Sequence, residues 1–449
     1  MDQEVDLLRL HAANPRRYPF LLQSVLHGTP QARYDILFAF PGEALTLRAD
    51  GRLSGRLRPR AGDDFLDNLD RWWEEERHDR GAETDLPFSG GWFIYLGYEL
   101  AGQVEPRLSL PLGNGGDALP VACAVRVPAA FIVDRHRHVT TLLAESGQAG
   151  LLEAMAGDLR QAPSCLPEDA RRPLLASPLE EDDPTRYLRG VRRVKDYIRA
   201  GDVFQVNLSR EWRGALREGV LPARVYQRLR SSNPAPFAGL CMLGDSAIIS
   251  SSPERLVRAR GGLIETRPIA GTAPRNGGQE EQGGGIEERL LAHPKERAEH
   301  VMLIDLERND LGRVCRPGSI EVNELLVLES YAHVHHLVSN VRGRLREGVR
   351  PGQVMRAVFP GGTITGCPKV RCMEIIAELE RQPRQAYTGS MGFLNHDGGM
   401  DLNILIRTLI QEGERIRLRA GAGIVADSIP DRELEETRAK ARGMLLALR

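Results

Sequence analysis

Cysteine, lysine and long apolar runs are scarce in this sequence. Its six cysteines are scattered without a Cys-x-x-Cys pair, which excludes a disulfide framework or a thiolate zinc site and is typical of reduced cysteines. No run approaches the ~20 apolar residues that cross a bilayer, and the first residues lack the apolar core of a secretion signal. The formal net charge of −1 argues against nucleic acid or an anionic membrane as the main partner. We therefore expect a cytoplasmic globular protein.

Lysine is rare among the charged residues. The 60 basic residues are nearly all arginine, and the lysines are Lys195, Lys295, Lys369 and Lys440. A reaction that needs a lysine as nucleophile or base must take it from these four. Lys195 and Lys295 lie in patterns typical of helix surfaces, which leaves few candidates for chemistry.

Short apolar strands dominate the sequence, and the helices between them do not alternate strictly with strands. This pattern favours an α+β fold. At 449 residues the chain exceeds the ~250–300 residues of one simple core. A Pro-, Ala- and Ser-rich acidic stretch at 161–183 is typical of a solvated linker, which predicts an N-terminal subdomain at 1–175 and a second unit at 183–449. Helices are expected after Asp183, a good N-cap before proline, and over 286–306.

The stretch from Phe359 to Arg371 combines three glycines and two threonines between an apolar run and a helical pattern. Glycines let the backbone approach a ligand closely, and amides at a helix start can bind an anion. It is not a Walker loop, because Pro368 precedes the lysine and Val370 follows it. Turn formation and anion binding both remain open for this stretch alone.

Charged residues near the end of the chain share helical faces. Glu433, Glu436 and Lys440 lie at i, i+3 and i+7, which is compatible with either a solvated ion-paired face or a ligand site. Glu299 lies on an earlier predicted helix, and two carboxylates from separate helices would suit a hard cation such as Mg²⁺. Arg407 is expected within a buried strand, where its guanidinium group would need a hydrogen-bond partner, commonly a carboxylate.

Several motifs, in this order, resemble the chorismate-utilising enzymes. They are Glu254 in Ser-Pro-Glu-Arg, Pro268–Thr272, Ala298–His300, Asp305 with Arg308–Asp310, His336–Ser339, the loop from Phe359, Gly421–Val425 and Glu435–Lys440. The match spans about Asp183 to Lys440. The family includes anthranilate synthase component I, aminodeoxychorismate synthase component I, isochorismate synthase and salicylate synthase. The resemblance implies a large composite β-sandwich with helices packed on its outer faces.

The resemblance also implies roles for individual residues. Glu299 and Glu436 would hold Mg²⁺, which binds the ring carboxylate of chorismate. Glu254 would be the general acid that assists loss of the C4 hydroxyl. The residues that would hold the enolpyruvyl carboxylate and nearby oxygens are Tyr387, Arg407, Gly421 and Gly423. The other expected pocket residues are Ala270, Gly271, Thr272, His336, Thr363 and Lys440.

Two positions bear on which reaction is expected. Gln205 stands where isochorismate and salicylate synthases carry a lysine base, and glutamine cannot deprotonate water at neutral pH, so ammonia is the expected nucleophile. Ala270 stands where well-studied aminodeoxychorismate synthases carry a lysine that adds covalently to the ring. Alanine is usual there in anthranilate synthases. We therefore predict no lysyl covalent intermediate.

Other segments resemble the aminodeoxychorismate branch, including Arg33–Ile36, Gly201–Leu208 and Asn233–Phe237. The leading hypothesis is an Mg²⁺-dependent subunit that makes 4-amino-4-deoxychorismate for 4-aminobenzoate and folate. The alternative is anthranilate synthase component I, and a remote one is a catalytically silent subunit that binds chorismate or tryptophan.

Two partners are implied as well. No segment resembles a glutaminase, so ammonia is expected from a separate glutaminase subunit. A region resembling the tryptophan site of relatives contains Leu22, Ser24, Pro236 and Phe237. That site is regulatory in some relatives and structural or absent in others.

Overall fold

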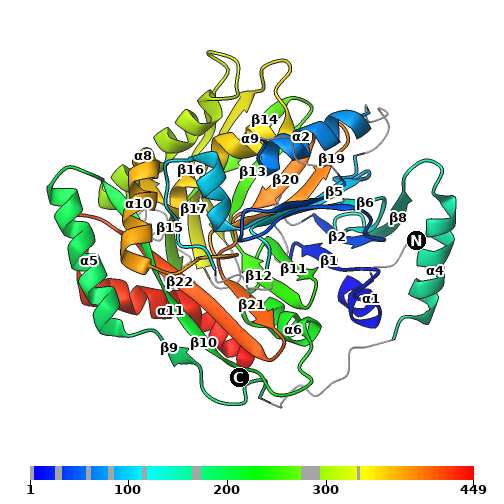
Figure 1. The fold of residues 1–449 in the computed structure, drawn as a ribbon, viewed down its shortest axis with the longest axis horizontal. Coiled ribbons are helices and arrows are strands. Elements are labelled where there is room, and N and C mark those ends of the chain that lie inside the picture. Colours follow the sequence, from blue (N-terminus) through cyan, green and yellow to red (C-terminus); the bar gives the residue numbers. More distant parts are fainter. Residues whose placement is uncertain are drawn as a thin grey trace, which may run out of the picture.

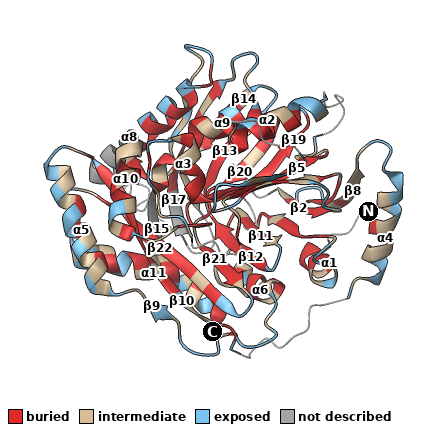
Figure 2. Ribbon diagram, in the orientation of Figure 1, coloured by how far each residue is buried: buried red, intermediate tan, exposed pale blue. Residues whose placement is uncertain are grey.

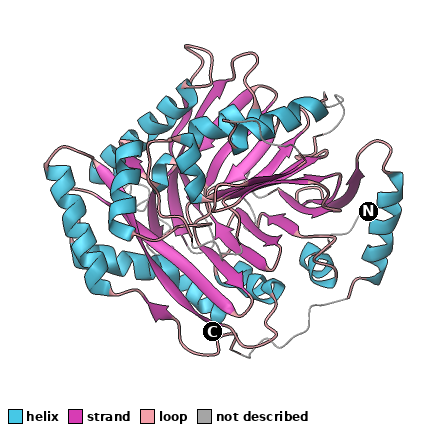
Figure 3. Cartoon of the chain, in the orientation of Figure 1, coloured by secondary structure: helices cyan, strands magenta, loops and turns pink. Residues whose placement is uncertain are grey.

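The computed structural model describes residues 5–25, 33–56, 62–78, 85–113, 119–163, 173–274, 294–330 and 334–449. Within these ranges, the side chains of residues 270–274, 294–299, 330 and 334–336 are not described. Two large antiparallel β-sheets dominate the molecule, and helices lie around them (Figure 1; Figure 3).

The first sheet joins strands from both ends of the chain, and β1 pairs on one side with β2 and on the other with β11. Its spatial order is β18 (Gly366–Cys367), β10 (Gln205–Ala215), β22 (Arg415–Ile424), β21 (Thr408–Glu412), β12 (Ser246–Ser252), β11 (Phe237–Leu243), β1 (Phe20–Gln23), β2 (Tyr34–Ala39), β7 (Ala129–Asp134) and β8 (Val139–Ala144), with β9 (Glu180–Glu181) paired to β10.

The second sheet is built in the same way, because β5 from the N-terminal part pairs with β19 from the C-terminal part. Its order is β15 (Ile269–Pro274), β17 (Val334–Arg344), β14 (Leu263–Arg267), β13 (Arg255–Arg260), β20 (Met400–Asn403), β19 (Ser390–Asn395), β5 (Gly91–Leu96), β6 (Ala122–Val127), β3 (Ala44–Leu47) and β4 (Leu53–Gly55), with β16 (Glu321–Ser330) paired to β17. Each sheet therefore runs through both predicted segments, 1–175 and 183–449. The subdomain boundary itself stays a prediction.

An aromatic core lies between the two sheets. Phe20 of the first sheet stacks on Phe93 of the second, with ring centroids 4.0 Å apart, and Phe38 meets Phe93 edge-on. In the central strands β2 and β5, alternate residues point to this interior and the others to the helix layers, so these strands are buried on both faces (Figure 2).

Helices cover the outer faces of both sheets. The second sheet packs against α2 (Phe65–Glu76), α8 (Pro294–Gly312) and α9 (Pro351–Val358). The first packs against α1 (Leu7–Ala13), α4 (Ala149–Gln161), α6 (Pro222–Ser232) and α11 (Pro430–Leu448), and at one end against α5 (Pro184–Arg199) and α10 (Lys369–Glu380). Short turns η1 (Tyr98–Leu100), α3 (Ala101–Val104) and η3 (Gly362–Ile364) complete the order. The predicted α+β fold, a composite β-sandwich with helices outside, is confirmed.

Local predictions were met unevenly. The Asp183 side chain accepts a hydrogen bond from the amide of Thr185 at 2.9 Å, so α5 begins as expected. The helix expected over 286–306 is α8, and residues 286–293 lie outside the described residues. The solvated linker predicted at 161–183 was wrong for its last part, because β9 pairs with β10 and Leu175 bridges to Leu216. None of the described helices combines the length and apolarity needed to span a bilayer.

Candidate functional site

Glu254 and Arg407 both lie where the chain passes from one sheet to the other. Glu254 connects β12 to β13, and Arg407 lies between β20 and β21. Backbone hydrogen bonds join the two crossings: the Ile404 amide donates to the Glu254 carbonyl at 3.0 Å, and the Ser251 amide donates to the Arg407 carbonyl at 3.1 Å. These crossings therefore place an acid and a cation at the same junction of the fold.

The Glu254 side chain is buried, with 5% of its surface exposed. Burial raises its pKa to about 7, against the opposing effects of the Thr363 hydroxyl, the Ile269 amide and the charges of Lys440 and Arg407. A carboxyl group that is about half protonated at neutral pH is suited to give a proton to a leaving group.

Arg407 is not within a strand, so that prediction was wrong. It lies in a bend with φ of 53°, a left-handed conformation that is uncommon for a residue with a side chain. Burial lowers its pKa, and the nearby Tyr387, Glu436 and Glu254 oppose that change. Among the residues whose side chains are described, none forms a salt bridge with Arg407, so the expected protein carboxylate partner was not found. A desolvated guanidinium of this kind is suited to an anionic ligand.

Tyr387 lies directly against the backbone of β22. A Cβ added at Gly421 would be 2.8 Å from the Tyr387 hydroxyl and 2.8 Å from Asn207 Oδ1, so only glycine fits there. Gly421 is opposite Ser209 in β10, and Gly423 is opposite Asn207. The structure thus brings Tyr387, Gly421 and Gly423 to one place, as the resemblance implied.

The final helix contributes the charged pair Glu436 and Lys440. Lys440 Nζ is 2.6 Å from Glu436 Oε1 and donates to the Gly421 carbonyl at 3.1 Å. The positive charge of Lys440 also acts to lower the pKa of Glu254, and the negative charge of Glu436 acts to raise the pKa of Arg407. The face shared by Glu436 and Lys440 therefore adjoins the junction rather than only solvent.

The loop that begins at Phe359 forms another wall. Within it, η3 carries Thr363, and β18 pairs with the start of β10, where Gln205 is opposite Cys367. Gly366 has φ of 125°, and a Cβ there would be 2.1 Å from the Gln205 carbonyl. Gln205 is buried at this edge of the site.

Five predicted residues have backbones in the structure but side chains outside its description: Ala270, Gly271 and Thr272 in β15, His336 in β17 and Glu299 in α8. In the register of β15 and β17, Thr272 is opposite His336. Helix α8 packs against both strands. The roles expected of these five residues stay predictions.

The residues present are compatible with a hard cation. Among the residues whose side chains are described, no cluster of three or more possible metal ligands occurs. The Glu436 side chain is 47% exposed and pairs with Lys440 through Oε1. Magnesium takes few protein carboxylates and completes its shell with substrate oxygens and water, so this donor fits.

Sequence reasoning missed two polar groups near the site. The sequence assigned Tyr187 of α5 only to a helix core, yet its buried hydroxyl has no hydrogen-bond partner among the described residues. The charges of Glu433 and Glu436 and the Tyr387 hydroxyl act on it. Glu307 of α8 is buried, and burial beside Asp310 raises its pKa to about 8. Periodicity could have flagged Glu307, since a glutamate on a buried helix face is rare.

The four residues of the tryptophan-like region meet in a separate cavity of about 450 Å³ between the sheets. Leu22, Ser24, Pro236 and Phe237 all line it. Ser24 Oγ donates to the Pro236 carbonyl at 2.9 Å, and the Arg255 guanidinium lies 4.9 Å from the centre of the Phe237 ring. Its lining includes neither Glu254 nor Arg407, although Arg255, the residue after Glu254, lines it.

The raised pKa of Glu254 makes stability depend on pH. Since the folded-state pKa of about 7 exceeds the ordinary value of 4.5, the stability that the neutral acid confers is fully present below pH 4.5 and is lost as the pH rises through 7. We expect Glu254→Gln to be more stable than the wild type by up to about 3 kcal/mol above pH 8 and nearly equal to it near pH 5. Urea unfolding at each pH measures this difference. Glu218→Gln, at an exposed position, controls for the change of side chain. A difference for Glu254→Gln that does not vary with pH would contradict the raised pKa.

Comparison with known proteins gives a consistent result. The family described as chorismate binding enzyme matches residues 26–446. Anthranilate synthase component 1 of Thermus thermophilus is 43% identical over 382 residues, which cover 83% of this chain and 79% of that protein. Aminodeoxychorismate synthase component 1 of Bacillus subtilis is 48% identical over 273 residues, covering 61% and 57%.

The fold has a solved counterpart as well. The crystal structure of anthranilate synthase component I from Streptococcus pneumoniae TIGR4 superimposes with a TM-score of 0.79 and 32% sequence identity, covering 94% of this chain and 93% of that one. With the family match over most of its length and the junction built from that family's motifs, this chain belongs to the chorismate-binding enzymes.

Proposed function

We propose that the protein makes 4-amino-4-deoxychorismate from chorismate and ammonia, as the synthase subunit for 4-aminobenzoate and folate. The junction supports this reaction class. There Glu254, whose pKa is raised to about 7, lies beside Arg407, a cation without a salt bridge to any residue whose side chain is described. Chorismate is a dianion that loses a hydroxyl group, so it needs both a cation and an acid. The segments that resemble the aminodeoxychorismate branch and the Bacillus subtilis relative of that name support the product.

In this proposal the chain's own groups bind and orient the substrate. Arg407, the Tyr387 hydroxyl and the amides near Gly421 and Gly423 receive the enolpyruvyl carboxylate, because donors in a desolvated site bind an anion strongly. Glu436 and Glu299 would hold Mg²⁺, which would supply positive charge for the ring carboxylate.

Glu254 then moves the proton that the reaction requires. In the net step the ammonia nitrogen bonds to C4 of the ring, the C4–O bond breaks, and Glu254 protonates the departing hydroxyl, which leaves as water. The Glu254 carboxylate takes back a proton from the new ammonium group, so the enzyme ends as it began. Gln205 supplies no base for water, which favours amination over hydroxylation.

A second candidate is anthranilate synthase component I. It is favoured by Ala270 and by the relative from Thermus thermophilus, which carries that name. The cation, the acid and the metal-binding carboxylates would serve that reaction equally, because both begin with ammonia and loss of the C4 hydroxyl.

The partners follow from the same chemistry. The chain would receive ammonia from a separate glutaminase subunit. The cavity that Leu22, Ser24, Pro236 and Phe237 line would bind tryptophan, with the indole beside the Phe237 ring. The cytoplasmic location stays a prediction.

The product of the purified protein tests the proposal. We expect incubation with chorismate, Mg²⁺ and an ammonium salt to yield an amine that gives 4-aminobenzoate only after a lyase is added. Chromatography with mass detection identifies the product. Direct formation of fluorescent anthranilate with pyruvate would establish the second candidate instead, and no turnover at all would indicate a silent subunit.

Removal of the Glu436 carboxylate tests the metal site. Loss of outer-shell partners of a metal ligand costs about 10–100-fold, so Glu436→Gln should lower kcat/KM by more than about 100-fold and raise the Mg²⁺ concentration for half-maximal rate. Initial rates over a Mg²⁺ titration measure both.

Glu435→Gln is the matched control, because Glu435 is 67% exposed and pairs with Arg438 on the solvent side. Its rates and Mg²⁺ dependence should equal those of the wild type. Equal losses in both variants would place the metal elsewhere.

Tryptophan binding tests the second cavity. We expect isothermal titration calorimetry to detect L-tryptophan binding that Phe237→Ala weakens by about tenfold, since an aromatic pair contributes about 0.5–1.5 kcal/mol. Glu254→Gln should leave that binding unchanged, because Glu254 does not line the cavity. Absence of binding heat in the wild type would refute this part of the proposal.

A further inference from the structure

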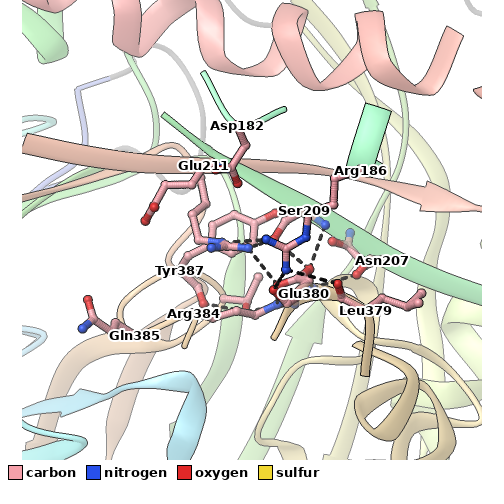
Figure 4. Close-up of polar contacts among 12 residues, drawn as sticks. Asp182, Arg186, Asn207, Ser209, Glu211, Leu379, Glu380, Arg384, Gln385 and Tyr387 are labelled. Carbon is pink, nitrogen blue, oxygen red and sulfur yellow. Dashed lines mark hydrogen bonds and ion pairs between the residues drawn. The ribbon is translucent and has the colours of Figure 1, made fainter. Parts of the chain in front are cut away.

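Arg384 is an almost fully buried arginine whose five guanidinium N–H groups all have acceptors. Nε donates to Glu380 Oε2 at 3.0 Å, and Nη2 donates to Glu380 Oε1 at 2.6 Å and to the Asn207 carbonyl at 2.8 Å. Nη1 donates to the Ile364 carbonyl at 3.2 Å and to Thr388 Oγ1 at 3.3 Å. Figure 4 shows Arg384 and Glu380 beside Asn207 and Tyr387. A guanidinium has five donors, so none is spare.

Three of these acceptors, outside Glu380, belong to separate segments that form the candidate site. Ile364 ends the turn η3 that carries Thr363, and Asn207 is two residues beyond Gln205 in β10. Thr388 follows Tyr387 directly. One side chain thus connects the loop, the strand and the tyrosine on which the proposed chorismate site depends.

The backbone around Tyr387 is strained. Gln385 has φ of 52° and Thr388 has φ of 64°, and a left-handed conformation is an outlier for a β-branched threonine. Such conformations persist only where surrounding contacts hold them. The Glu99 carboxylate accepts hydrogen bonds from the amides of Arg384 at 2.7 Å and Gln385 at 3.0 Å, which fixes the start of the turn.

Thr388 is held at the other end of this turn. Its amide donates to the Leu405 carbonyl at 2.8 Å, and its hydroxyl donates to the Tyr387 carbonyl at 2.5 Å while accepting from Arg384. The Arg384 guanidinium also lies 5.5 Å from the centre of the Tyr387 ring. The direction of the Tyr387 side chain is therefore linked to Arg384 through both the backbone and the ring.

We propose that Arg384 is a positioning residue, which holds the strained turn so that the Tyr387 hydroxyl lies against Gly421 and can receive a substrate carboxylate. This inference rests on the proposed function only in that Tyr387 contacts the substrate. Arg384 itself does not reach the substrate, because Glu380, Asn207, Ile364 and Thr388 take all its donors.

The test compares Arg384→Lys with Arg419→Lys. Both arginines are buried and share the Glu380 carboxylate, but among the described residues Arg419 donates hydrogen bonds to Ser209 and Glu380 and not to the turn at 385–389. Lysine keeps the charge and has three donors, so Arg384→Lys must lose contacts to the turn. We expect hydrogen exchange of the amides of residues 385–389 to become at least about tenfold faster in Arg384→Lys and to stay unchanged in Arg419→Lys. Unchanged exchange in Arg384→Lys would overturn the proposal.

Kinetics then separate positioning from general structural damage. Loss of a hydrogen bond to a charged group corresponds to about 10–100-fold, so the KM for chorismate should rise by that factor in both Arg384→Lys and Tyr387→Phe, with kcat little changed. The double variant should be no worse than Tyr387→Phe alone. Additive losses would show that Arg384 does not act through Tyr387.

Two further measurements keep the outcomes distinct. If Arg384→Lys does not fold, Thr388→Gly serves instead, because it removes the hydroxyl that accepts from Arg384 while glycine adopts the same φ without strain. We expect Thr388→Gly to raise the KM for chorismate in the same way. An unchanged KM would overturn the proposal. Failure of the proposed function would appear in the wild type as absence of chorismate turnover, whereas the exchange result needs no turnover.

Discussion

The desolvation of charge at the two sheet crossings is the constraint on which the site depends. Glu254 and Arg407 are carried by neighbouring connections; Glu254 is buried, Arg407 is half-buried, and desolvation raises the pKa of Glu254 and lowers that of Arg407. The protein surroundings leave Glu254 partly neutral and Arg407 without a salt bridge to a described residue. A dianionic substrate would pair with the Arg407 guanidinium and accept the proton of Glu254. The unfavourable free energy of desolvating these two groups would therefore favour substrate binding and proton transfer.

The crossings keep their geometry because buried polar contacts fix the segments around them. Arg384 and Glu380 connect β10, the loop after α9 and the turn before Tyr387, and Lys440 connects α11 to β22. Such networks stabilise one arrangement only when every member is satisfied, as the five contacts of Arg384 are. The sandwich itself supplies rigidity, since strands from both ends of the chain share each sheet.

The strand and helix pattern predicted the α+β class, because hydrophobic periodicity and helix caps are local signals, and the resemblance of short motifs supplied the candidate site residues, whose roles stay predictions. It placed Arg407 in a strand, since nothing local in Ile404–Thr408 indicates a left-handed bend. It also described residues 161–183 as a free linker, since pairing of β9 with β10 depends on strands distant in sequence. Arg384 was not noticed, because its five acceptors come from four segments that only the fold brings together. Gln205 and Ala270 favour different products, and their side-chain types alone do not choose between the two.

The protonation state of Glu254 is the quantity that tests this view of the site most directly. Infrared difference spectra of wild type minus Glu254→Gln, recorded at several pH values, isolate the carboxyl group of this one residue. We expect a band of a protonated carboxylic acid that is strong at about pH 5, half lost near pH 7 and replaced by carboxylate bands at about pH 9. Carboxylate bands that already dominate at about pH 5 would show an ordinary exposed glutamate and would contradict a desolvated acid beside Arg407.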